Sequence, residues 1–276
     1  IQIQIFQLQF LVFMIEQKYI NNTYDMKRLF PIFFSILFSL SVNAHFEKDT
    51  LKVLFVGNSF TYYYNLPQVV KAMSNESEKI YIDSRHSLVG GSNLSHHLNQ
   101  EKGSQTLEML NTQAFDYVVL NHHSLAATDN VHSFFEVSEK IVDLIRSKGA
   151  KPLFMMTWSY RDTSQMIEPI SRVYNDMAQQ LNVDVVPCGL LFERALSWDP
   201  HLDLYDDYKH PSNLGTYLNG LAFFKYFTGE KTSDFNKRIK KQDENGQELY
   251  LLFLKQRDAD LLQNVVDNYY FKTRLN

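Results

Sequence analysis

The residues of this chain whose types and spacing suit covalent chemistry are one serine and one aspartate–histidine pair. Ser59 follows the apolar run "KVLFVG", and Asp207 and His210 stand three residues apart in "LYDDYKHPSN". A serine hydroxyl becomes a good nucleophile when an imidazole accepts its proton, and a carboxylate holds the tautomer of that imidazole and stabilises its cation. Together the three residues predict acyl transfer through an acyl-serine. Asp206 is the alternative carboxylate if the turn is one residue wider, and a turn-forming role is the alternative for Ser59.

The elements that must position these residues alternate between strands and helices. Apolar runs predict strands, and helical spacing predicts helices between them. The strands are expected at 51–57, 79–89, 115–121, 151–159 and 183–189, and the helices at 66–75, 104–112, 131–149, 164–182 and 212–227. Strands without polar alternation are buried on both faces, and strand–helix alternation gives a mostly parallel sheet between helices. After Gly229 we expect an exposed charged run, then a closing helix within 249–270.

Three separated pieces of sequence converge at one edge of that sheet. In parallel α/β sheets, ligands bind at the carboxyl ends of the strands. Ser59, the Gly90-Gly91 turn and Asn121 all follow predicted strands. We therefore expect them along one rim.

Four blocks of sequence, taken together, resemble the SGNH (GDSL-like) hydrolase superfamily. The blocks are Gly57-Asn58-Ser59-Phe60, Gly90-Gly91-Ser92, the strand ending at Asn121, and Asp207-Tyr208-Lys209-His210-Pro211, and they span about 52–229. "GNSFTYYYNLP" and "FDYVVLNHHS" look especially like a secreted Bacteroidetes branch. The resemblance implies a flavodoxin-like three-layer α/β/α sandwich with a mostly parallel five-stranded sheet. It also implies a serine esterase site without a metal or organic cofactor.

The resemblance assigns roles to individual residues. Ser59 is the nucleophile, His210 the base and Asp207 its partner. The oxyanion hole takes the backbone N–H groups of Ser59 and Gly91, with Gly90 as the neighbouring alternative to Gly91.

The third oxyanion donor is an Asn side chain in the family pattern, and Asn121 is the candidate. The chain departs from the family here, because "NHHS" replaces the usual Gly-x-Asn-Asp block. If the strand ends later than predicted, His123 takes the donor position.

Aromatic residues near the expected rim are candidates for substrate contact. Tyr62, Tyr63 and Tyr64 follow the nucleophile closely. Tyr62 is the substrate-binding candidate among them, and packing of the first helix is expected for at least two of the three. Trp158, at the end of the fourth strand, and His123 are further candidates.

Composition argues against several other classes of protein. A formal net charge of −4 gives no electrostatic case for binding nucleic acid or an anionic membrane surface. Cys188 is the single cysteine, so neither an intrachain disulfide nor a cysteine metal cluster is available. In the doublets His96-His97 and His122-His123, adjacent helical residues would point about 100° apart and could not chelate together. No metal site is expected.

The stretch "MKRLFPIFFSILFSLSVNAH", starting at Met26, is typical of a secretory signal peptide. Its apolar run is short for a bilayer, which needs about 20 residues. We expect residues 26–44 to be cleaved, giving a secreted or periplasmic chain that begins at His45 and has no stable membrane anchor. An uncleaved anchor is the alternative. Residues 1–25 are interpreted as an upstream extension, and 45–276 as a single hydrolase domain.

The predicted function is ester hydrolysis, most simply removal of O-acetyl or other short acyl groups from carbohydrate. The substrate class comes from export and resemblance. One alternative is a lysophospholipase or thioesterase on the same fold. The other is a glycan-binding protein without catalysis.

Overall fold

Five strands form the central sheet of the computed structural model, which describes residues 48–233 and 235–275. The strands are β1 (Asp49–Gly57), β2 (Ile80–Leu88), β3 (Tyr117–Leu120), β4 (Lys151–Met155) and β5 (Asp184–Val186). Their order is β2-β1-β3-β4-β5, and every neighbouring pair is parallel. The predicted parallel five-stranded sheet is confirmed. The chain passes to β2 on one side of β1 and then to β3 on the other, which makes the carboxyl end of β1 a topological switch point.

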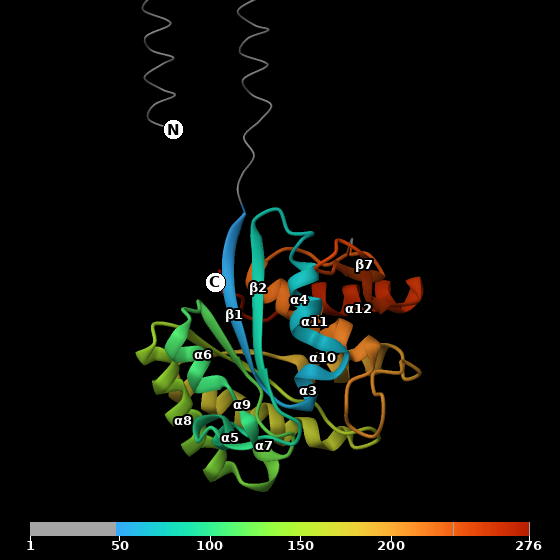
Figure 1. Ribbon diagram of the computed structural model, residues 1–276. Coiled ribbons are helices and arrows are strands. Elements are labelled where there is room, and N and C mark those ends of the chain that lie inside the picture. The colour runs from blue at the N-terminus through green and yellow to red at the C-terminus, as the bar shows by residue number, and fades with distance from the viewer. Residues whose placement is uncertain (1–47, 234, 276) are drawn as a thin grey trace, which may run out of the picture. The chain divides into compact units, whose positions relative to one another are not determined.

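Alternate residues of β1 supply two separate cores, one on each face of the sheet. Val53 and Phe55 belong to one apolar cluster, and Leu54 and Val56 belong to the other. Helices α4 (Leu66–Met73), α10 (Cys188–Trp198), α11 (Asn213–Thr228) and α12 (Gln256–Asp267) pack in the first cluster, and α6 (Thr106–Thr112), α8 (Val131–Ser147) and α9 (Ile167–Leu181) pack in the second (Figure 1). The result is the expected α/β/α arrangement.

Short helices gather where the strands end. They are α3 (Ser59–Tyr62), α5 (Leu94–Leu98) and α7 (Ala126–Asp129), and they lie at the lower end of the sheet in Figure 1. The 3₁₀ turns η1 (Tyr63–Asn65), η2 (Glu101–Gly103) and η3 (Ser164–Met166) complete the connections.

The last quarter of the chain differs from the prediction. The charged run contains strand β6 (Arg238–Gln242), which pairs antiparallel with β7 (Glu248–Phe253). The closing helix therefore begins only at Gln256. Ile239 and Leu252 are the buried anchors of this hairpin. β6 has one apolar residue and β7 has an unbroken apolar run, so neither strand shows the period-2 alternation of a half-buried strand.

Helix α10 was also not predicted. The sequence pattern extended the fifth strand to Gly189, but β5 ends at Val186 and α10 starts at Cys188. Pro187 lies between them and has no N–H to continue the strand ladder. Its fixed φ also suits a helix start.

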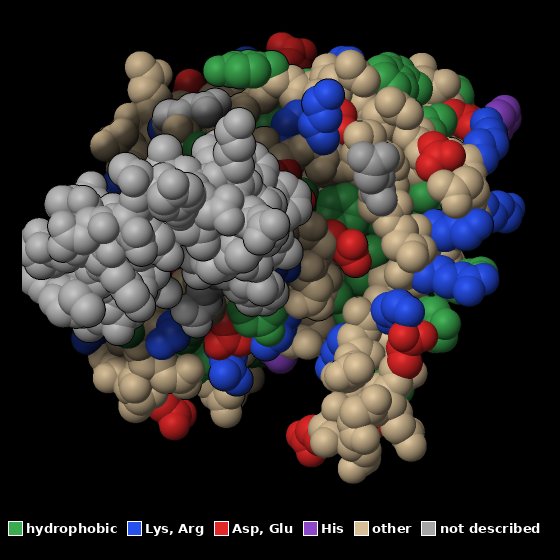
Figure 2. All heavy atoms as spheres, turned by 90° about the horizontal axis from the view of Figure 1, so that it is seen from above, with side chains coloured by type: hydrophobic (Ala, Val, Ile, Leu, Met, Phe, Trp, Pro, Cys, Tyr) green, Lys and Arg blue, Asp and Glu red, His purple; other side chains and the backbone are tan. Residues whose placement is uncertain are grey.

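The opposite end of the domain carries charges of both signs. Figure 2 looks down on the molecule from the top of Figure 1, and basic and acidic side chains are interspersed where side chains are coloured. Within 48–233 and 235–275, no helix is long and apolar enough to span a membrane. The predicted extension 1–25, the signal peptide 26–44 and the start at His45 lie outside the described residues.

Candidate active site

Ser59 stands at the carboxyl end of β1, on the first turn of α3. The strand ends at Gly57, where an added Cβ would lie only 2.8 Å from the Cβ of Asn121, so this close approach requires glycine. Asn58 caps the helix by accepting from the Phe60 N–H at 3.1 Å. Its side-chain amide donates to the backbone oxygens of Ser92 and His122, at 3.2 and 3.1 Å. One buried side chain thus ties together the segments that follow β1, β2 and β3.

The structure brings Ser59, His210 and Asp207 into one hydrogen-bonded chain. Ser59 Oγ lies 2.8 Å from His210 Nε2, and His210 Nδ1 lies 2.7 Å from Asp207 Oδ2. The other carboxylate oxygen accepts from the N–H groups of Lys209 and His210, both at 2.8 Å. Asp207 is therefore the carboxylate that faces the imidazole. Asp206, the alternative, instead accepts from the Tyr64 hydroxyl at 2.7 Å.

The carboxylate of Asp207 is held in its charged form. Partial burial would raise its pKa, but hydrogen bonds from the His210 ring and from the backbone N–H groups of His210 and Lys209 hold the pKa well below its usual range. An ionised carboxylate on Nδ1 keeps the proton on that nitrogen. Nε2 is then free to accept the proton of Ser59.

The segment that carries Asp207 and His210, called here the histidine loop (residues 199–212), is braced by residues that follow β4. Arg161 donates from Nε to the Asp207 carbonyl at 3.1 Å and from Nη2 to the Tyr205 carbonyl at 2.5 Å. The backbone N–H of Arg161 donates to the Tyr208 carbonyl at 2.9 Å. Three bonds from one residue hold the backbone around the candidate base.

Trp158 corrects a prediction. It was expected at the substrate rim, but it is fully buried, with its ring stacked between Phe60 and Phe192. Its indole N–H donates to the Lys209 carbonyl at 2.9 Å. Trp158, three residues after the end of β4, is therefore a buried support of the histidine loop rather than a substrate contact.

The tyrosines after the nucleophile also differ from the prediction, since none of the three is buried. Tyr63 stacks face to face on His210, with ring centroids 4.2 Å apart and planes 5° from parallel. Tyr62 stacks on Tyr63 and is 41% exposed. Tyr63 was not predicted as a neighbour of the base. Its position directly after the nucleophile's helix was the available signal.

The Gly90-Gly91 turn lies beside Tyr62. Gly91 has φ +62°, a conformation that favours glycine, and open space lies where a side chain would stand. At Gly90 an added Cβ would be 3.1 Å from the Tyr62 hydroxyl. Tyr62, the substrate-binding candidate, is thus an exposed ring next to this turn.

Asn121 and His123, the two candidates for the third oxyanion donor, lie in different surroundings. His123 was expected to take the donor position only if the third strand ended later than Asn121. β3 ends at Leu120, so that condition is not met. Asn121 is fully buried and accepts from the Thr61 hydroxyl at 3.2 Å. Among the described residues its Nδ2 has no hydrogen-bond partner. A buried amide without an acceptor has donor capacity to spare.

His123 is exposed instead. Its Nδ1 accepts weakly from the Leu125 N–H at 3.4 Å, which leaves the proton on Nε2. Burial of part of the ring, and the nearby Lys209, lower its pKa, so the ring is neutral at pH 7. Its neighbour His122 is buried, which lowers its pKa to about 3.

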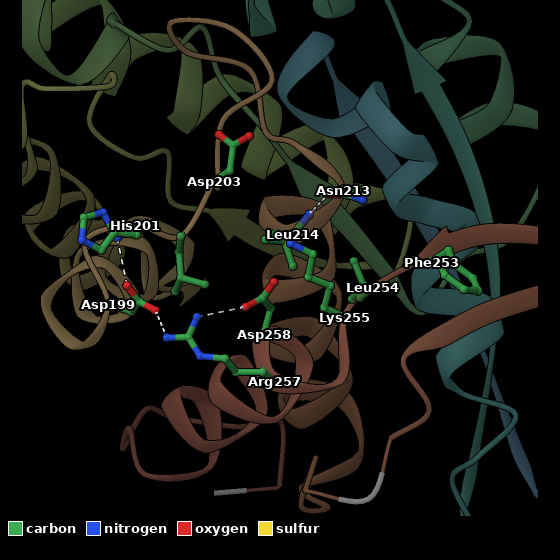
Figure 3. Close-up of a pocket in the computed structure, with 11 residues that line it drawn as sticks. Asp199, His201, Asp203, Asn213, Leu214, Phe253, Leu254, Lys255, Arg257 and Asp258 are labelled. Atoms are coloured by element: carbon green, nitrogen blue, oxygen red, sulfur yellow. Dashed lines mark hydrogen bonds and ion pairs between the residues drawn. The ribbon is translucent and has the colours of Figure 1, made fainter.

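A hollow of about 290 Å³ lies at the base of the histidine loop (Figure 3). Arg257, on α12, is hydrogen-bonded to Asp199, and that carboxylate also accepts from the His201 N–H at 2.9 Å. Arg257 also lies 3.9 Å from Asp258. The ion pair between Asp199 and Arg257 therefore ties the start of the histidine loop to α12. In the described part of the chain, no group of three His, Cys, Asp or Glu side chains is placed to hold a metal ion.

No protein-family model and no curated protein sequence matches this chain, but solved structures do. A protein from Slackia heliotrinireducens assigned to the SGNH hydrolases matches with a TM-score of 0.53 at 22% identity, covering 66% of this chain and 100% of its own. A GDSL-like lipase from Parabacteroides merdae matches at 0.51 and 14% identity, covering 66% and 98%. Axe2, an acetylxylan esterase from Geobacillus stearothermophilus, matches at 0.52 and 16% identity, covering 64% and 94%.

These likenesses define the class of fold. The chain has the α/β fold of the SGNH hydrolases, as its sequence blocks implied.

Proposed function

We propose that this chain is a serine ester hydrolase that uses Ser59, His210 and Asp207. The observation that carries the proposal is the hydrogen-bonded chain from Ser59 Oγ to His210 Nε2, at 2.8 Å, and from His210 Nδ1 to Asp207, at 2.7 Å. A serine, an imidazole and a carboxylate in this order form a nucleophile with its base and the group that orients the base.

The reaction proceeds in two halves. Ser59 Oγ forms a bond to the ester carbonyl carbon while His210 Nε2 takes the hydroxyl proton. The bond to the alcohol oxygen then breaks, and the alcohol leaves with the proton from His210. In the second half, water attacks the acyl-serine and gives a proton to His210. Ser59 recovers its proton as the carboxylic acid leaves.

The negative charge that develops on the carbonyl oxygen is stabilised by hydrogen-bond donors at the rim. In this proposal they are the backbone N–H groups of Ser59 and Gly91 and the side-chain amide of Asn121. The Ser59 N–H is at a helix start and has no partner inside its helix. Loss of one such donor typically raises the barrier by about 3–4 kcal/mol.

The substrate class we propose is a carbohydrate that carries O-acetyl or other short acyl esters. One structural neighbour is an acetylxylan esterase, which supports this class by analogy. The exposed Tyr62 beside the Gly90-Gly91 turn gives a rim with an aromatic face and a polar tip, a surface suited to a sugar ring.

We also propose that the chain is exported, with a cleaved signal peptide at 26–44 and one hydrolase domain from His45 onward. Amino-terminal sequencing of the protein recovered from its host tests this. A first residue of His45 supports cleavage, and a first residue within 1–25 contradicts it.

The activity is tested by hydrolysis of p-nitrophenyl acetate, butyrate and octanoate by the protein from His45. Ser59→Ala and His210→Ala are the matched variants. Turnover that is highest on acetate and lost in both variants supports the proposal. Activity that rises with chain length favours the lysophospholipase or thioesterase alternative. Folded wild type that hydrolyses neither these esters nor acetylated polysaccharides contradicts the proposal, and glycan affinity unchanged in Ser59→Ala would then favour the binding protein.

A further inference from the structure

A fully buried histidine that the proposed reaction does not use is hydrogen-bonded to the turn that carries the nucleophile. His97 belongs to α5 and is 0% exposed. Its neighbour in the doublet, His96, is engaged elsewhere, because its Nδ1 accepts from the Asn93 N–H at 3.0 Å and completes the cap of α5. The two rings therefore have separate tasks.

Both ring nitrogens of His97 have partners. Nε2 lies 3.0 Å from the Gly57 carbonyl oxygen, and Nδ1 lies 2.8 and 2.9 Å from the hydroxyls of Thr106 and Ser104. The carbonyl can only accept, so Nε2 carries the proton and Nδ1 accepts from a hydroxyl. Burial, opposed by the bond to Gly57, lowers the pKa of His97 to about 4, so the ring is neutral at pH 7.

The same carbonyl is the meeting point of two turns. Ser92 Oγ lies 3.1 Å from the Gly57 oxygen and 3.0 Å from His97 Nε2. Gly57 lies two residues before Ser59, and Ser92 directly follows Gly91. His97, Ser92 and the Gly57 carbonyl form a closed triangle that joins the turn after β1 to the turn after β2.

We propose that His97 is a positioning residue that fixes the Ser59 and Gly91 turns relative to each other. Through them it places the two backbone N–H donors of the oxyanion hole, so this inference rests on the proposed function. Those donors act on charge that develops in the transition state. Loss of the His97 bond should therefore lower kcat and leave KM nearly unchanged.

Two variants separate the hydrogen bond of His97 from its volume. In His97→Gln the side-chain amide can still donate to the Gly57 carbonyl, whereas His97→Leu fills the space without a donor. Gln263→Leu is the control, because Gln263 is a buried donor in α12, bonded to Tyr217 and Phe235. It should lower the melting temperature without changing kcat.

The expected results on p-nitrophenyl acetate are distinct for each variant. His97→Leu lowers kcat roughly 10- to 100-fold with KM within about twofold, less than the full loss of a donor because the N–H groups remain. His97→Gln stays within about fivefold of wild type. If His97→Leu does not fold, Ser92→Ala replaces it. That variant removes the second side-chain donor to the Gly57 carbonyl, which also accepts from the Val89 backbone N–H at 2.9 Å. It should lower kcat about fivefold or more.

Wild type and Ser59→Ala are measured in the same series. Turnover by wild type, lost in Ser59→Ala, establishes the proposed function independently of His97. Against that background, wild-type kcat in His97→Leu (or in Ser92→Ala where it replaces His97→Leu), or equal losses in His97→Leu and His97→Gln, overturns the positioning role alone. No turnover by folded wild type contradicts the proposed function, and the His97 inference falls with it.

Discussion

Two histidines near Ser59 have similar hydrogen-bond distances and very different surroundings. The side chain of His210 is 14% exposed and lies between a carboxylate and the Ser59 hydroxyl. His97 is fully buried among hydroxyls and the Gly57 carbonyl. No carboxylate is within salt-bridge distance of His97 among the described residues.

The difference shows how the surroundings of a histidine decide whether it can act as a base or as a fixed hydrogen-bond donor. A carboxylate on Nδ1 stabilises the imidazolium, so His210 can take up and release a proton. A buried imidazole without a charged partner keeps its neutral form, so His97 serves as a fixed donor. Substitutions on each side of this comparison should have effects of different size.

Asp207→Asn removes the carboxylate charge beside His210, the feature that distinguishes its surroundings from those of His97. The amide no longer holds the proton on Nδ1 or stabilises the cation, so kcat should fall roughly 10³-fold. The loss is smaller than for a buried aspartate, because the side chain of Asp207 is 51% exposed and water can replace part of its effect. The measurement is kcat on p-nitrophenyl acetate at pH 7.5.

Asp206→Asn is the matched control for that variant. Asp206 is adjacent in sequence, but its carboxylate faces Tyr64 rather than His210. Its loss should change kcat less than about threefold, because exposed polar pairs such as Asp206–Tyr64 contribute little and this one does not touch His210. Equal losses in the two variants would contradict the assignment of Asp207.

Asn121→Ala and His123→Ala sharpen the oxyanion side of the comparison. Asn121→Ala should lower kcat about 10²-fold, because it removes a donor to the developing charge. His123→Ala should cost less than about fivefold. The reverse order of the two losses would assign the third donor to His123.

The folded protein should lose stability in acid because of His97. In the unfolded chain this imidazole binds a proton below about pH 6.5, whereas in the folded chain it stays neutral down to about pH 4. The contribution of His97 to the free energy of unfolding is therefore fully present above pH 6.5 and is lost as the pH drops from 6.5 to 4. The full contribution is on the order of 3 kcal/mol at 1.36 kcal/mol per pKa unit.

Urea unfolding at pH 7, 5.5 and 4.5 measures this contribution. His97→Gln cannot titrate, so its free energy of unfolding should fall less steeply with acid than that of wild type. His122, whose burial lowers its pKa to about 3, continues to contribute in both proteins. Identical pH slopes would show that His97 is not held neutral by folding.

The sequence predicted the parts of the molecule that depend on residue type and order. Apolar runs without polar alternation predicted the parallel strands, and the strand-end positions predicted that Ser59 and Gly91 follow β1 and β2. Asp207 and His210 could be paired because one short loop holds both. These features are local, or follow from general rules of sheet topology.

Features that depend on packing in three dimensions were not predictable in the same way. The burial of Trp158 depends on Phe60, Phe192 and the histidine loop packing around it. The stacking of Tyr63 depends on a residue 147 positions further along the chain, His210. The role inferred for His97 needs the positions of Gly57 and Ser92 around it. Its doublet with His96 gave no sign of that contact.

The central claim is that His210 and Asp207 activate Ser59 as a nucleophile. The most direct measurement is labelling of the protein with a fluorophosphonate, followed by intact-mass and peptide mass spectrometry. The account predicts one adduct, on Ser59, in wild type and in the control Asp206→Asn, no adduct in Ser59→Ala, and labelling slowed at least about 100-fold in His210→Ala. An unlabelled wild type, an adduct on a different serine, or labelling of Ser59 at the same rate without His210 would contradict it.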